Sequence, residues 1–111
     1  MPRRIAADRF VRGVLVHAYE EATDALARND YATARLDLMI GAECAPESAQ
    51  VHYMLARVYA KDKANTKALA ELRTAIATGF TDREELENNP DFVAVRQTPE
   101  FAKLLRQIEK P

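Results

Sequence analysis

Apolar side chains recur every three and four residues along most of the chain, which is the spacing of one buried face on an α-helix. Short groups of turn-forming residues, such as Arg28-Asn29-Asp30, separate these segments. No stretch alternates apolar and polar residues for long enough to predict a strand. The pattern therefore predicts an all-α chain. The four longer helices are expected near 3–28, 31–43, 47–61 and 66–78.

The last thirty residues predict shorter helices. Thr81 and Glu84 have the spacing of a capping box, in which the threonine hydroxyl caps the helix start and the glutamate reaches back. Pro90 and Pro99 each follow a capping side chain and suit the first helical position. Helices are therefore expected near 82–88, 90–96 and 99–109.

The residue pattern of the first helical pair recurs in the second pair. Tyr19, Ala22, Ala34 and Leu38 return 34 residues later as Tyr53, Ala56, Ala68 and Leu72. A fixed period of this length indicates stacked helix pairs, and small residues let the helices approach where they cross. The chain is interpreted as one domain with four parts. They are an N-terminal helical extension (1–14), a first repeat (15–48), a second repeat (49–80) and capping helices (81–111).

The second unit resembles a tetratricopeptide repeat. The residues that carry the resemblance are Leu55, Ala56, Tyr59, Ala68, Leu72 and Ala75. The first unit is similar more loosely, through Ala22, Tyr31, Ala34, Leu38 and Pro46. The stretch GFTDREELENNPDFVAVRQTPEFAKLLRQI resembles the segment that closes such repeats in many bacterial proteins. The resemblance implies an α-α superhelix of helical hairpins with a short-helix C-terminal cap. Glu21 departs from a usual leucine, and Lys63 departs from a usual turn glycine.

In this family, the first helices of successive pairs line a concave groove that receives a peptide. The matching positions here are Val16, Tyr19, Thr23, Leu26, Gln50, Tyr53, Met54, Arg57 and Lys61. The resemblance therefore implies a non-catalytic adaptor or accessory domain that binds a protein or peptide. Two alternatives stay open at these positions. Tyr19 and Tyr53 would instead pack against a neighbouring helix, and Arg57 and Lys61 would either attract an acidic partner or form a solvated face.

Two other functions fit the same sequence. The first is a homo-oligomerisation module, such as a homodimer, that docks through the apolar residues Ile5, Phe10, Val11 and Val14. The second is a regulatory domain of a larger enzyme, whose catalytic domain would lie outside this sequence.

Composition narrows the remaining functions. The net charge of −1 argues against nucleic acid, whose binding needs a basic excess. No segment has the length of a membrane span or the pattern of a signal peptide, so a cytoplasmic protein is expected. The lone Cys44 and two histidines, His17 and His52, are interpreted as structural residues. No metal and no cofactor are expected, and the acidic residues of 82–91 are assigned to helix capping.

Overall fold

The computed structural model describes the backbone of residues 2–108, with the side chains of Arg9 and residues 12–108. Six α-helices and two short 3-10 helices follow one another, and residues 2–108 contain no strand. In chain order they are α1 (Pro2–Ala27), α2 (Tyr31–Cys44), α3 (Ala49–Lys61), α4 (Asn65–Ala77), α5 (Arg83–Asn88), η1 (Pro90–Phe92), η2 (Val95–Gln97) and α6 (Pro99–Arg106). The prediction of an all-α chain is confirmed.

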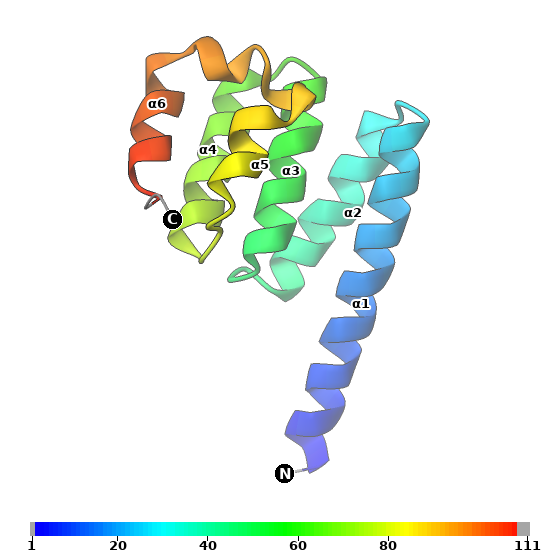
Figure 1. The fold of residues 1–111 in the computed structure, drawn as a ribbon. Helices are drawn as coiled ribbons and strands as arrows, with labels where there is room; N and C mark the ends of the chain where they lie inside the picture. The colour runs from blue at the N-terminus through cyan, green and yellow to red at the C-terminus, as the bar shows by residue number, and fades with distance from the viewer. Residues whose placement is uncertain (1, 109–111) are drawn as a thin grey trace.

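The four longer helices form two antiparallel hairpins, α1 with α2 and α3 with α4, and α2 packs on α3 between them (Figure 1). Helix α1 runs without a break through Gly13 and is 26 residues long, whereas α2 has 14. The N-terminal half of α1 therefore extends past the other helices (Figure 1). The side chains of Ile5, Phe10 and Val11, predicted to drive self-association, lie outside the described residues; Val14 is half-buried.

Helix α3 connects two apolar clusters. One face of α3 joins α1 and α2 in the first cluster, and the other joins α4 and the C-terminal segments in the second. The α3 residues of the first cluster are Val51, Met54, Leu55 and Val58. Those of the second are Tyr53, Ala56 and Ala60. The C-terminal segments add Leu86, Phe92, Val95, Phe101, Leu104 and Ile108. Residues 83–108 thus share a core with the second hairpin, and we call them the cap.

The two hairpin turns have the same backbone geometry, 34 residues apart. Asn29 (φ 59°) and Lys63 (φ 62°) both adopt the left-handed conformation. In each turn, the next amide donates to the carbonyl five residues before it, with an N···O distance of 2.8 Å in both. This is the hydrogen bond of a Schellman motif, which satisfies an end carbonyl of the helix. The repeat seen in the apolar pattern therefore extends to the turns.

Lys63→Gly is expected to stabilise the chain. A side chain in the left-handed region costs about 1 kcal/mol, and part of this gain is offset because glycine is freer in the unfolded chain. We expect urea unfolding to give a free energy higher by about 0.5 kcal/mol. The control is Ala70→Gly, at an exposed position inside α4, which should lower it by about 1 kcal/mol. Equal losses in both variants would contradict the turn geometry.

Three details of the helix starts and ends differ from the sequence prediction. Asp82, not Thr81, caps α5, and its carboxylate accepts from the Glu85 amide at 3.1 Å. Because α5 begins at Arg83, the capping position falls one residue later than the capping-box pattern suggests. The sequence pattern suggests that Asn65 caps α4, but Asn65 is the first residue of the helix, and Ala64 at the capping position makes no side-chain hydrogen bond. The single helix expected near 90–96 is the two turns η1 and η2.

The outer face of α1 is polar where the equivalent face of α3 is apolar. The α3 positions Val51, Met54, Leu55 and Val58 are buried against the first hairpin. The residues 34 positions earlier are His17, Glu20, Glu21 and Asp24, which are exposed or half-buried. Glu21 is half-buried, and it lies beside Asp37 of α2, where burial first and then the neighbouring Glu21 carboxylate raise the pKa of Asp37.

Candidate functional site

The predicted groove residues do not share one surface. Tyr19 is 44% exposed, and Thr23 and Gln50 are also exposed. Tyr53 and Met54 are buried, at 5% and 1% exposure, respectively. The expectation that these two side chains face an open groove is therefore wrong.

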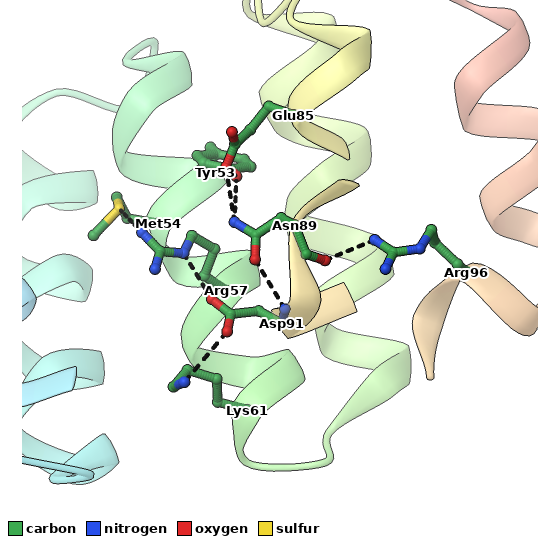
Figure 2. A network of polar contacts seen from close by, with 8 residues as sticks. All are labelled: Tyr53, Met54, Arg57, Lys61, Glu85, Asn89, Asp91 and Arg96. Carbon is green, nitrogen blue, oxygen red and sulfur yellow. Dashed lines mark hydrogen bonds and ion pairs between the residues drawn. The ribbon is translucent and has the colours of Figure 1, made fainter. Parts of the chain in front are cut away.

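Tyr53 is buried because the cap closes over it. Its ring stacks on Phe80 with centroids 4.5 Å apart and planes 15° apart, and it meets Phe92 at 5.9 Å. Its hydroxyl donates to Glu85 at 2.6 Å and accepts from the Asn89 amide at 3.0 Å (Figure 2). Burial is the main cause that raises the pKa of Tyr53, and the hydrogen bond to Glu85 raises it further. Tyr53 thus holds the cap on α3.

Met54 lies on a different side of α3 from Tyr53 and packs in the first cluster. The two neighbouring residues face different clusters because successive helical positions are about 100° apart around the axis. The sulfur of Met54 accepts a hydrogen bond from the Arg57 guanidinium at 3.4 Å (Figure 2).

Arg57 and Lys61 are brought together on α3, and both bind Asp91 of the cap. Arg57 Nε donates to Asp91 Oδ2 at 2.9 Å, and Lys61 Nζ donates to Asp91 Oδ1 at 3.2 Å (Figure 2). The Asp91 side chain is only 10% exposed, whereas those of Arg57 and Lys61 are 29% and 28% exposed. One nearly buried carboxylate therefore faces two cations that both reach the surface.

Asn89 orients Asp91. Its side-chain oxygen accepts from the Asp91 amide at 2.8 Å, while its carbonyl accepts from Arg96 at 2.7 Å (Figure 2). Asn89 also caps η1. The hydrogen bonds of Asn89 therefore fix the backbone at the start of η1, and this holds Asp91 in place for the two cations.

The same two cations line a hollow between α1 and α3. Its walls are Thr23, Leu26, Ala27, Arg57 and Lys61, and its volume is about 270 Å³. We call it the α1–α3 hollow. It combines an apolar side, made by Leu26 and Ala27, with a side made by Arg57 and Lys61, whose shared partner Asp91 is not part of the lining. Of the predicted groove residues, Thr23, Leu26, Arg57 and Lys61 meet here. A larger hollow of about 400 Å³ between α4 and the C-terminal end of the cap has no charged side chain.

Glu85 accepts two hydrogen bonds that lower the pKa of its carboxyl below the ordinary value of 4.5. The bond from Tyr53 has the larger effect and the bond from Asn89 the smaller one. A carboxyl whose folded-state pKa is depressed stabilises the fold above its unfolded-state pKa, and this contribution is lost as the pH falls through the folded-state value. Wild-type chain should therefore lose more stability than Glu85→Gln on acidification below pH 4.5. Urea midpoints across a pH series measure this, and parallel curves would contradict the role of Glu85.

Both histidines have a carboxylate partner that sequence reasoning missed. His17 Nε2 lies 3.1 Å from Glu21, one helical turn away, and His52 Nδ1 lies 2.8 Å from Glu71 on α4. The second nitrogen of His52 meets the Pro46 carbonyl at 2.8 Å. His52 therefore joins both helices of the second hairpin to the loop before α3. Among the described residues, no group of three or more His, Cys, Asp or Glu could hold a metal ion.

Comparison with known proteins gives a distant relative. No family model matches the chain, and no solved structure matches it significantly. The chain is 29% identical over 93 residues to a chloroplastic protein of Arabidopsis thaliana. The matched region is 83% of this chain and 25% of that protein, so the chain spans about a quarter of its curated relative. Within residues 2–108, no helix combines the length and apolarity that crossing a membrane requires.

Proposed function

We propose that this chain is a non-catalytic peptide-binding module. In this proposal the two hairpins stack as tetratricopeptide-like pairs, and the α1–α3 hollow takes an acidic residue of a bound segment. The observation that carries the proposal is the hollow itself, because it places two surface-reaching cations beside an apolar wall. In this proposal an aliphatic side chain of the same ligand packs on the wall, chiefly on the exposed Ala27, because Leu26 is only 6% exposed.

The repeat geometry supports the stacked arrangement. The identical turns at Asn29 and Lys63 and the small buried residues Ala22 and Ala56 all keep the 34-residue offset. The first helices of the two pairs, α1 and α3, then flank the hollow, as expected for the inner side of a superhelix.

The charges support an acidic ligand. Arg57 and Lys61 carry two positive charges against one negative charge on Asp91, and the Arg57 fork keeps donors beyond the Nε that Asp91 uses. A ligand carboxylate therefore gains charge-assisted hydrogen bonds without removing Asp91.

The test uses labelled short peptides built from Leu, Ala and Glu, and the same peptides with Lys in place of Glu. Fluorescence polarisation should detect binding of the Glu series, weakening with added salt because the cations are partly exposed. The Lys series should not bind. Equal binding of both series, or of neither, would contradict an acidic-peptide site.

A further inference from the structure

Helix α2 carries an apolar surface that the fold does not require. Leu36, Met39 and Ile40 are 60%, 47% and 49% exposed. Their spacing puts them on one face of the helix, and we call them the α2 stripe. The stripe is separate from the α1–α3 hollow, because the residues that line the hollow all belong to α1 and α3.

The second hairpin supplies an internal comparison. Helix α4 has the same place in its hairpin as α2 has in the first, and the residues 34 positions after the stripe are Ala70, Arg73 and Thr74. Ala70 and Arg73 are exposed, like their counterparts, and Thr74 is half-buried. Since α4 folds with small or polar residues at these positions, the large apolar side chains of α2 are not needed for the hairpin.

The charges beside the stripe are arranged symmetrically about its centre. Arg35 lies four residues before Met39 and Glu43 lies four residues after it. In an antiparallel pairing of two α2 helices about Met39, each Arg35 faces the Glu43 of the other copy. A parallel pairing would instead set like charges against each other.

Arg35 can make such a contact because the ion pair that it already forms, with Asp62, is weak. Its pair with Asp62 is long, at 3.5 Å, and both side chains are more than a third exposed. Exposed pairs of this kind contribute little to stability. Glu43 is exposed on the same helix.

We propose that the α2 stripe is the contact surface of a homodimer, in which two α2 helices pack antiparallel around a two-fold axis at Met39. A two-fold interface needs a surface that complements itself, and the Arg35 and Glu43 arrangement has this property. The stripe is small for a stable dimer, so the association is reversible and depends on concentration.

The first test is the solution mass by light scattering over a concentration series. Wild-type chain should move from monomer to dimer, and Leu36→Glu should weaken association at least about tenfold, because it buries a charge in the contact. The matched control is Ala70→Glu, which introduces the same charge at the equivalent position of α4 and should dimerise normally. Circular dichroism verifies that both variants fold. A wild-type monomer throughout, or equal effects of both variants, would overturn the proposal.

The second test addresses the geometry. Glu43→Arg should weaken the dimer, and adding Arg35→Glu in the same chain should restore it, because the facing pair is reversed but kept. In a Cys44→Ser background, Met39→Cys should form a disulfide-linked dimer under mild oxidation, since the two copies of residue 39 meet at the axis. Failure of the charge reversal to restore association, or absence of the cross-link in a chain that still dimerises, would overturn the antiparallel arrangement.

Discussion

Tyr53→Ala is expected to destabilise the chain severely. The substitution removes a ring that packs against Phe80 and Phe92, and it leaves Glu85 and Asn89 without their hydroxyl partner. Large-to-small changes at buried aromatic positions cost about 3–5 kcal/mol. That is a large share of the free energy of unfolding of a small domain. Thermal unfolding followed by circular dichroism measures the loss.

Tyr19→Ala is the matched control for this prediction. Tyr19 occupies the same position of the first repeat, but it is 44% exposed. Its loss is expected to cost less than about 1 kcal/mol, as for surface substitutions in general. A Tyr53→Ala variant that melts like wild type would mean that the ring faces an open groove, as the repeat pattern alone indicates.

Replacing both Arg57 and Lys61 by glutamine is expected to abolish acidic-peptide binding. Hydrogen bonds to charged groups contribute about 1.5–3 kcal/mol each, so losing two corresponds to about 100-fold or more in affinity. Glutamine keeps a hydrogen-bond donor near Asp91, which limits the cost of leaving that nearly buried carboxylate without its cations. Fluorescence polarisation with the Leu, Ala and Glu peptides measures the change.

The control for that pair is Lys103→Gln with Arg106→Gln. These two cations are exposed on α6, and the variant has the same net charge as the first one. Its affinity for the peptides should stay close to that of wild type. If both double variants lose binding equally, the peptides respond to overall charge and not to the α1–α3 hollow.

Local signals in the sequence are enough to predict most helices. The apolar period predicts the longer helices, and Pro90 and Pro99 predict two of the starts in the cap. The start at Arg83 differs because Thr81 and Asp82 are both capping residues and compete for the capping position, whereas α4 starts at Asn65 with Ala64 at that position and no side-chain cap. That competition is settled by backbone geometry, which the residue types alone do not determine.

The repeat pattern does not predict the burial of Tyr53. The 34-residue offset makes Tyr19 and Tyr53 equivalent, yet Phe80, which stacks on Tyr53, corresponds to Pro46 in the first unit. The difference arises because the cap, and not another repeat, follows the second hairpin. Equivalent positions at the end of a stack meet different neighbours from those inside it.

The pairing of Asp91 with Arg57 and Lys61 could not be predicted from the sequence either. Capping alone is the role that the sequence suggests for the acidic residues of 82–91, and this is right for Asp82. Asp91 instead crosses to α3, 30 residues from Lys61 in the chain. The available signal is two cations one turn apart and an acidic segment of opposite charge, but only the tertiary fold brings them together.

Amide chemical shifts show directly whether the α1–α3 hollow binds an acidic segment. A Leu, Ala and Glu peptide is added to ¹⁵N-labelled chain while backbone amide signals are followed. We expect the largest shifts at Thr23, Ala27, Arg57 and Lys61, with little change along the α2 stripe. Shifts concentrated on α2 or on α6, with the amides around the hollow unchanged, would contradict it.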